Sequence, residues 1–283
     1  MIQVVGVVGA GTMGAGIAQV CALSGFTTLL FDVNADQVDS ALRTIDKNLS
    51  SAVGKGKLTD QKKSETMNRL VAVRALSELK ADLVIEAAVE KLEIKRTLFS
   101  ELEKINNGTA ILASNTSSIS ISQISSVLKN PSLCIGLHFF NPADRMKLVE
   151  IIPGNATDPR VVGEINEFSH QIGKTSVTAK DSPGFIVNRV ARHYYGESLK
   201  LLEEGLADVS TIDTLLRSAG FKMGPFELMD LIGVETNLSV TKSVFEGFNR
   251  NPKFSPSAIQ QKLVDEGHFG RKSGKGFYEY SNK

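Results

Sequence analysis

The run "VVGVVGAGTMGAGIAQ" near the start of the chain constrains the fold more than any other segment. A β-branched stretch is followed directly by Gly9, Gly11 and Gly14, with Thr12 and Met13 among them, in a G-x-G-x-x-G pattern. The first glycine permits a tight turn, the second lets a pyrophosphate approach the backbone, and the third allows close helix–strand packing. The helix that opens here offers N–H groups to phosphates. These five residues therefore predict a dinucleotide-binding turn.

A carboxylate at the end of the second expected strand indicates the type of cofactor. The segment "TTLLFD" ends at Asp32, 18 residues past Gly14. An acid at this place accepts hydrogen bonds from ribose hydroxyls and repels a 2′-phosphate. No arginine follows Asp32 directly, so we predict NAD rather than NADP. The alternative is a glycine-rich turn that binds no ligand. In that case the strand, the glycine spacing and the acid would occur together by chance.

Strand-like and helix-like segments alternate along the first part of the chain and then give way to helices alone. A long amphipathic helix is expected over about residues 36–53, and the helical part begins after the Ser-Pro-Gly stretch at 182–184. The pattern predicts an α/β protein: a Rossmann-type, doubly wound, mainly parallel sheet over residues 1–182, then an all-α C-terminal domain over 183–283. The expected strands are "IQVVGVVGAG", "TTLLFD", "ADLVIEAA", "TAILASNTS", "LCIGLHFF" and "MKLVEII".

Composition narrows the class of protein. A formal net charge of +1 over 283 residues gives no general attraction to nucleic acid or anionic membranes. No apolar run approaches the ~18 residues of a membrane span, and the N-terminus lacks the basic segment of a signal peptide. Cys21 and Cys134 are predicted to be buried free thiols. We expect a cytoplasmic protein without nucleic-acid, membrane or metal partners; the alternative location is that of a mature chain that has lost a transit peptide.

Polar residues follow or interrupt the later strands. Ser117 lies in "ASNTSS", His138 and Asn141 in "GLHFFNP", and Glu150 within the apolar "MKLVEII". A buried carboxylate needs a partner, and a histidine fits, because the acid would fix its tautomer and stabilise the imidazolium. His138 would then be a base and Glu150 its orienting partner. Beside NAD, a base indicates alcohol oxidation. The alternative is a structural histidine and a strand glutamate on an exposed face.

Several longer blocks occur together in one order, and they resemble a known family. They are "GAGTMGAGIAQ", "VIEAAVE", "ASNTSS", "GLHFFNP", "MKLVE", "DSPGFIVNR", "MGPFELMDLIG" and "GRKSGKGFYEY". Together they resemble the 3-hydroxyacyl-CoA dehydrogenases, in particular the short, stand-alone 3-hydroxybutyryl-CoA dehydrogenase type. The resemblance covers essentially the whole chain. It implies NAD-dependent interconversion of (S)-3-hydroxyacyl-CoA and 3-oxoacyl-CoA, and a homodimer formed mostly through a helical domain that also closes over the substrate.

The resemblance also implies roles for individual residues. His138 matches the catalytic histidine and Glu150 its acidic partner, while Ser117 and Asn188 match residues that position the substrate. The implied cofactor contacts are Asp32, Glu90, Lys95, Ser117 and Asn141, with Lys275 a weaker candidate. From the sequence alone, Glu90 and Lys95 suit a pair at the edge of the cleft; the alternative is an ordinary acid at a helix start and a solvated lysine.

The CoA carrier requires cations, and the acyl tail is the least determined part of the substrate. Lys47, Lys55 and Lys57 lie on or after the long helix, where the family places CoA contacts, and Lys55 is our choice; a solvated helix face is the alternative. The chain departs from the usual family pattern at Asp144 and Arg145. The basic residues Arg145, Arg192 and His193 raise the hypothesis of a carboxylated tail, as in 3-hydroxyadipyl-CoA enzymes; the alternative is that they pair with acids of the helical domain.

Other functions on the same scaffold stay open from the sequence. A non-catalytic NAD-binding protein would be free to lose at least one of Ser117, His138, Glu150 and Asn188, and all four are present. A sugar-acid dehydrogenase would act on free hydroxy acids without CoA. A protein that works only within a multifunctional complex would need a hydratase partner for activity.

Overall fold

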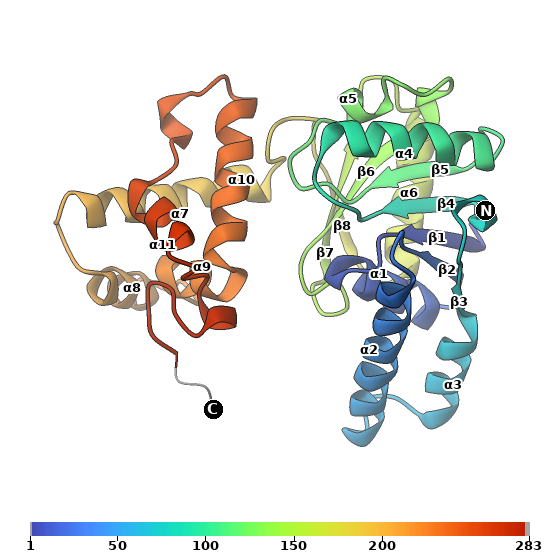
Figure 1. The fold of residues 1–283 in the computed structure, drawn as a ribbon, viewed down its shortest axis with the longest axis horizontal. Helices are drawn as coiled ribbons and strands as arrows, with labels where there is room; N and C mark the ends of the chain where they lie inside the picture. The colour runs from blue at the N-terminus through green and yellow to red at the C-terminus, as the bar shows by residue number, and fades with distance from the viewer. Residues whose placement is uncertain (1, 281–283) are drawn as a thin grey trace. The chain divides into compact units, whose positions relative to one another are not determined.

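The computed structural model describes residues 2–280 and divides the chain into two compact units, Met1–Ser182 and Pro183–Lys283 (Figure 1). The first unit is an α/β domain, and the part of the second unit up to residue 280 is helical apart from isolated bridges near its end. The outermost residues of the two predicted domains, Met1 and 281–283, lie outside the described part of the chain.

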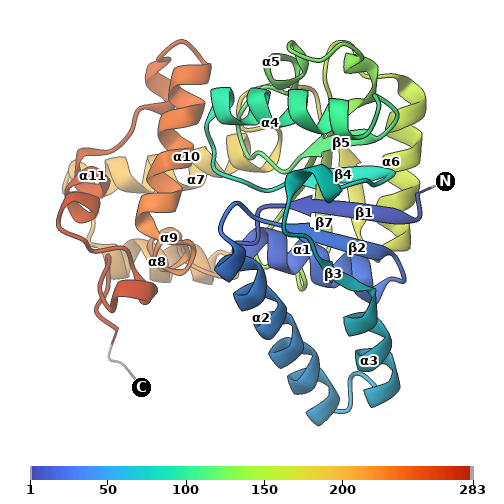
Figure 2. The same cartoon turned by 45° about the vertical axis from the view of Figure 1, so that its right-hand side comes forward.

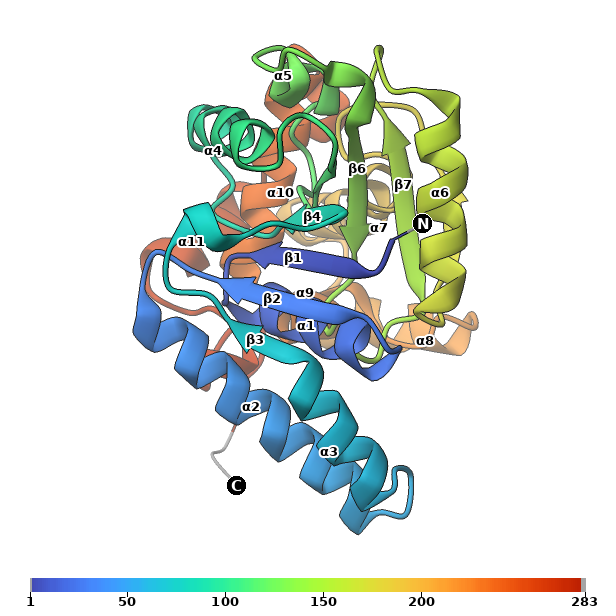
Figure 3. The ribbon, with the colours of Figure 1, turned by 90° about the vertical axis from the view of Figure 1, so that its right-hand side faces the viewer.

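An eight-stranded sheet forms the first unit, in the order β3-β2-β1-β4-β5-β6-β7-β8 (Figure 3). Neighbouring strands pair in parallel except β6 and β7, which are antiparallel. The prediction of a mainly parallel, Rossmann-type sheet is confirmed. The strands are β1 (Val4–Val8), β2 (Thr27–Phe31), β3 (Leu70–Ala72), β4 (Leu83–Glu86), β5 (Ile111–Ser114), β6 (Cys134–Phe139), β7 (Leu148–Pro153) and β8 (Thr175–Thr178).

Helices cover both faces of this sheet. One face shares a core with α1 (Thr12–Leu23), α2 (Ala35–Gly54) and α6 (Pro159–Gln171), while α4 (Leu92–Ile105) and α5 (Ile121–Ser125) lie over the other (Figure 2). The predicted long helix at about 36–53 is α2, and its N-cap Asn34 accepts a hydrogen bond from the Asp36 N–H. α2 runs beyond the sheet together with α3 (Asp60–Arg69) (Figure 3).

The core explains why these segments fold as they do. In β1, β2 and β4 every second side chain faces α1 and α2, and Val7, Leu30 and Leu83 are fully buried there. Fully burying an aliphatic side chain contributes about 1.5–3 kcal/mol. Cys21 and Cys134 are both buried and unpaired by disulfide, as predicted. Burial raises the pKa of the Cys21 thiol to about 12, so this side chain acts as a small apolar group rather than as a nucleophile.

In the described residues of the second unit, five α-helices pack around a separate core. They are α7 (Val187–Glu203), α8 (Val209–Ser218), α9 (Pro225–Ile232), α10 (Val234–Gly247) and α11 (Ala258–Asp265). α9 and α10 are separated at Gly233, where φ is 104°, a value that favours glycine. The buried carboxylate of Asp230 accepts hydrogen bonds from the N–H groups of Phe277 and Tyr278 and from the Tyr280 hydroxyl, and so fastens the last described segment to α9.

None of the helices in residues 2–280 combines the length and the apolar composition that a membrane crossing requires.

Candidate active site

The glycine turn joins β1 to α1 and is shaped by close backbone contacts. A Cβ on Gly9, where φ is 98°, would lie 2.6 Å from the Ala87 carbonyl oxygen, and a Cβ on Gly14 would lie 1.7 Å from the Gly9 oxygen. A Cβ on Gly11 would meet nothing within 4 Å. α1 begins with no side-chain cap and no acid in its first turn. Ala10, Gly11 and Thr12 line a pocket. The uncapped N–H groups and the positive potential of the helix start are suited to an anion, and the turn, including Thr12 and Met13, fits a pyrophosphate.

Gly14 gives a direct test of this turn. We expect Gly14→Ala to lower NADH affinity at least tenfold and to lower the thermal midpoint, because the new methyl group must displace the Gly9 carbonyl. The matched control is Gly163→Ala in α6, where an added Cβ meets nothing within 4 Å. That change should leave NADH affinity unaltered and raise stability slightly. Fluorescence titration with NADH and thermal unfolding measure both variants; unchanged affinity in Gly14→Ala would contradict the prediction.

Asp32 is held against the glycine turn. It follows β2 directly, and its carboxylate accepts hydrogen bonds from the Ala10 N–H (2.8 Å) and the Asn34 N–H (2.9 Å). Each carboxylate oxygen retains a second lone pair, so the side chain can still accept bonds from a ribose. The next side chain, Val33, is 95% exposed and offers an apolar surface beside it. The glycine turn and the adjacent Asp32 carboxylate are therefore suited to the pyrophosphate and the ribose of NAD.

His138 and Glu150 are brought together by the antiparallel pairing of β6 and β7. The two residues are direct partners in the register, so their side chains lie on the same face. Nδ1 of His138 lies 2.8 Å from Oε2 of Glu150. His138 is 6% exposed and Glu150 is fully buried. His138 lies near the carboxyl end of β6. Because β6 runs parallel to β5 and the preceding strands, this end lies at the same edge of the sheet as the glycine turn.

Glu90 organises the turn that carries Ser117. Its Oε1 accepts hydrogen bonds from the Thr116 hydroxyl (2.5 Å), the Ser117 N–H (3.0 Å) and, at 3.4 Å, the hydroxyls of Ser117 and Ser118. The Asn115 side chain accepts a bond of 2.8 Å from the Phe139 N–H and so ties this turn to the strand of His138.

A second buried acid, Glu86, which the motifs do not single out, lies next to this turn. Glu86, at the end of β4, is fully buried and lies 2.6 Å from Nζ of Lys95, whose side chain is 1% exposed. Lys95 is therefore not a solvated lysine, which was the alternative open from the sequence. The available signal was an acid within the apolar "LVIEAA", the same pattern that drew attention to Glu150.

The remaining predicted residues lie on several different elements. Asn141 is exposed after β6 and precedes a cis peptide to Pro142. Asn188 lies in the first turn of α7, and Lys275 forms an ion pair of 3.4 Å with Glu279. Both belong to the helical unit, and their predicted roles stay predictions. Lys47, Lys55 and Lys57 are exposed on or just after α2.

The contacts of Arg145, Arg192 and His193 do not match the alternative open from the sequence, in which these residues pair with acids of the helical domain. Arg192 is buried, and its bonds go to neutral oxygens: the carbonyls of Asn188 and Asn237 and the Thr241 hydroxyl. Burial lowers the pKa of Arg192 to about 10. His193 packs on Phe254, with ring centroids 5.4 Å apart. Arg145 lies 3.7 Å from its neighbour Asp144 within the first unit.

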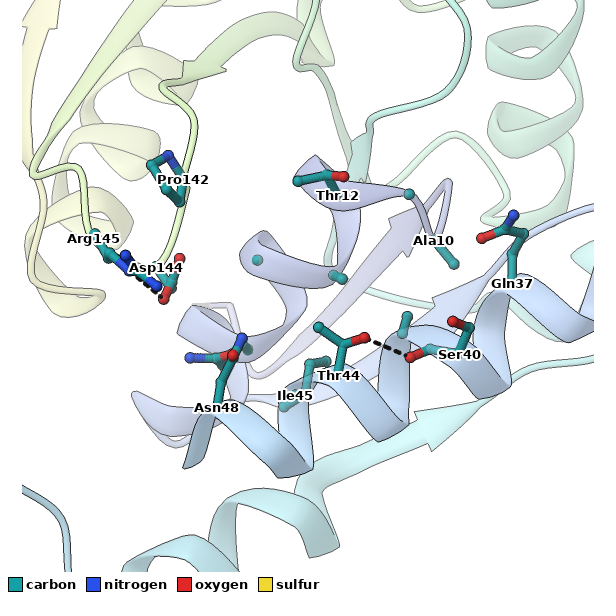
Figure 4. Close-up of a pocket in the computed structure, with 15 residues that line it drawn as sticks. Ala10, Thr12, Gln37, Ser40, Thr44, Ile45, Asn48, Pro142, Asp144 and Arg145 are labelled. Atoms are coloured by element: carbon teal, nitrogen blue, oxygen red, sulfur yellow. Dashed lines mark hydrogen bonds and ion pairs between the residues drawn. The ribbon is translucent and has the colours of Figure 1, made fainter. Parts of the chain in front are cut away.

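A pocket of about 290 Å³ extends from the glycine turn along α1 and α2. Figure 4 shows Thr44 and Asn48 of α2 on one side and Asp144 and Arg145 on the other. The loop that carries Asp144 and Arg145 is held by Lys174. Its Nζ donates hydrogen bonds to the carbonyls of Ala143 and Met146 at 2.5 and 2.7 Å.

Within residues 2–280, no group of three His, Cys, Asp or Glu side chains is arranged to hold a metal ion.

The fold and the turn together define a Rossmann-type dinucleotide-binding protein with a buried His–Glu pair. Residues 4–182 match the model for the NAD-binding domain of 3-hydroxyacyl-CoA dehydrogenase, and residues 184–280 match the model for its C-terminal domain. The chain therefore belongs to the 3-hydroxyacyl-CoA dehydrogenase family, as its motifs indicated, and NAD is the cofactor of this family's N-terminal domain.

Individual relatives cover the whole chain but carry different substrate names. A 3-hydroxyadipyl-CoA dehydrogenase of Escherichia coli K12 is 48% identical over 99% of this chain, which spans only 59% of that protein. A 3-hydroxybutyryl-CoA dehydrogenase of Bradyrhizobium diazoefficiens is 43% identical over 99% of this chain and 96% of its own length. The crystal structure of (S)-3-hydroxybutyryl-CoA dehydrogenase from Ralstonia eutropha superimposes with a TM-score of 0.95, at 38% identity and with complete coverage of both chains.

Proposed function

We propose that this protein interconverts (S)-3-hydroxyacyl-CoA and 3-oxoacyl-CoA with NAD, and that its substrates are short-chain thioesters such as 3-hydroxybutyryl-CoA and acetoacetyl-CoA. The observation that carries the proposal is the buried contact between His138 and Glu150 at the same sheet edge as the glycine turn. A general base next to a nicotinamide is the arrangement that alcohol oxidation needs. The coverage of a stand-alone 3-hydroxybutyryl-CoA dehydrogenase along nearly its whole length supports the short-chain assignment.

In the proposed mechanism the two ring nitrogens of His138 have different tasks. The Nδ1–H group donates a hydrogen bond to the Glu150 carboxylate, which fixes the tautomer in which Nε2 accepts a proton from the substrate hydroxyl. The Glu150 carboxylate then stabilises the imidazolium. In the reverse direction the same imidazolium polarises the ketone and returns the proton. Bound NAD supplies the acceptor for the hydride that leaves the substrate carbon. Ser117 and Asn188 are proposed to hold the reacting oxygen and the thioester region.

The pocket along α2 suits the carrier half of the substrate. Amide and hydroxyl groups of Gln19, Thr44 and Asn48 line it, and they can bond to the amides of a pantetheine arm. Lys55 lies at the C-terminal end of the same helix, where an ammonium group would meet the CoA phosphates. We propose that the helical unit completes the substrate site and forms a homodimer, and that the enzyme works in the cytoplasm.

A second substrate, 3-hydroxyadipyl-CoA, is favoured by one observation. The relative that is 48% identical over nearly all of this chain bears that substrate name. A carboxylated tail would require a cation, and the buried guanidinium of Arg192 bonds to neutral oxygens, namely the carbonyls of Asn188 and Asn237 and the Thr241 hydroxyl.

Reduction of three ketones by NADH tests both substrate assignments. We expect turnover of acetoacetyl-CoA and essentially none of free acetoacetate, because the carrier supplies the binding energy. A preference for 3-oxoadipyl-CoA over acetoacetyl-CoA would move the assignment to the dicarboxylate, and Arg192→Ala should then reverse that preference. Failure to reduce any thioester, with NADH still bound, would overturn the proposed function.

A further inference from the structure

We infer that Lys174 is a positioning residue for the pocket along α2: it holds the loop of residues 142–146 in the place from which Arg145 binds a phosphate of the CoA carrier. The inference rests on the proposed function for the identity of the carrier, while the hold of Lys174 on the loop can be tested without any ligand.

Lys174 is a buried cation whose hydrogen bonds go to a single loop. It directly precedes β8 and is 6% exposed. Its Nζ donates to the carbonyl oxygens of Ala143 at 2.5 Å and Met146 at 2.7 Å. Both acceptors are backbone carbonyls rather than carboxylates. Burial of an ammonium group costs free energy unless its hydrogen bonds offset the loss of water, so we assign the role of this charge to the loop that it binds.

The loop forms a tight turn between β6 and β7. The Pro142 carbonyl accepts hydrogen bonds from the N–H groups of Arg145 at 3.0 Å and Met146 at 2.9 Å. The two carbonyls that Lys174 binds lie three residues apart in this turn. One ammonium group therefore ties both ends of the turn.

The loop also packs closely on α1. Ala143 is 1% exposed, and a Cβ added to Gly16 would lie 3.1 Å from the Ala143 Cβ. Next to Lys174, the Thr175 N–H donates to the Lys147 carbonyl at 2.8 Å, where β7 begins. The loop thus has contacts with both α1 and the start of β8, and its position relative to the pocket depends on both.

Arg145 gives the loop a possible role in binding. Of the described residues that line the pocket, it is the only cation. Its side chain is 77% exposed, and its contact with the Asp144 carboxylate is 3.7 Å long. Figure 4 shows both residues across the pocket from Asn48 of α2. An exposed guanidinium is suited to phosphate, and CoA carries phosphates.

Lys174→Met tests the hold on the loop. Methionine keeps the apolar stem but removes the donors, so the Ala143 and Met146 carbonyls lose their partner. We expect the amides of the 142–147 peptide to exchange at least tenfold faster in this variant, because the turn opens more often.

Two further variants complete this test. Lys180→Met, which changes an exposed lysine just after β8, should keep wild-type exchange. Lys174→Gln, whose shorter amide can reach at most one carbonyl, should exchange at an intermediate rate, and it provides the test if Lys174→Met does not fold. Wild-type exchange of the 142–147 peptide in the Lys174 variants would overturn the inference.

A double-mutant cycle tests the connection to the carrier. We expect Lys174→Met and Arg145→Ala each to weaken the binding of CoA about tenfold in a calorimetric titration. Because the lysine acts through the arginine, the double variant should lose about tenfold rather than 100-fold. The KM for acetoacetyl-CoA should rise in parallel while kcat stays within about threefold, since a uniform binding contact is lost.

The NADH affinity distinguishes the two phosphate-bearing ligands. It should stay within about threefold in all three variants, because the glycine turn joins β1 to α1 and Asp32 follows β2. A tenfold loss of NADH affinity would assign the phosphate to the dinucleotide and overturn the inference. Additive losses of CoA affinity, or unchanged CoA affinity in Lys174→Met, would also overturn it and leave Lys174 a structural lysine.

The proposed function and this inference fail in different ways. Absence of thioester turnover by a wild-type protein that still binds CoA would refute the proposed reaction, and the CoA titrations would still decide the inference. The exchange of the 142–147 peptide decides without any ligand whether Lys174 holds the loop.

Discussion

Replacing His138 by alanine is expected to lower kcat for acetoacetyl-CoA reduction about 10²- to 10⁴-fold, the usual contribution of a general acid or base. The affinity for NADH should change little, because the glycine turn joins β1 to α1 and Asp32 follows β2, whereas His138 lies in β6. Stopped-flow or steady-state measurement of NADH consumption gives kcat, and a separate fluorescence titration gives the affinity.

The control for this variant is His170→Ala, which removes an exposed histidine from the last turn of α6. It should retain wild-type turnover. If His138→Ala also turned over within threefold of the wild type, His138 would be a structural histidine, which was the alternative open from the sequence.

Glu150→Gln is expected to lower kcat by roughly 10³-fold while the protein stays folded. The amide preserves the shape of the side chain but removes the charge that stabilises an imidazolium 2.8 Å away. If the amide nitrogen faces Nδ1, the histidine must carry its proton on Nε2, and the base is lost. Turnover in both directions should fall together, because the same pair serves as base and as acid.

The control for Glu150→Gln is the same change at Glu164, an exposed acid on α6. Glu164→Gln removes a carboxylate without disturbing a buried contact and should leave kcat unchanged. Thermal unfolding of Glu150→Gln separates loss of catalysis from loss of fold. A folded variant with near wild-type turnover would show that Glu150 does not act through His138.

Short-range patterns in the sequence determined a large part of this protein. The glycine spacing at 9–14 predicted the β1–α1 turn because only residues without a Cβ tolerate the contacts that Gly9 and Gly14 make there. The alternation of strand and helix runs predicted the mainly parallel sheet, since parallel strands need helical crossovers. The role of Asp32 as a ribose acceptor was predicted from its position at the end of the second strand. Each of these features depends on neighbours in the chain.

Tertiary structure decided what depends on residues far apart in the chain. The contact between His138 and Glu150 requires the antiparallel register of β6 and β7, and a slip of one residue would place the two side chains on opposite faces. The burial of Lys95 has the same origin: its sequence context fits a solvated helix face, but the fold closes α4 over Glu86 at the end of β4. Local sequence sets backbone conformation and periodicity, whereas strand register and burial are set by packing across the whole sheet. For that reason the candidate chemistry was visible in the residues, while the network that holds Ser117 appeared only in the structure.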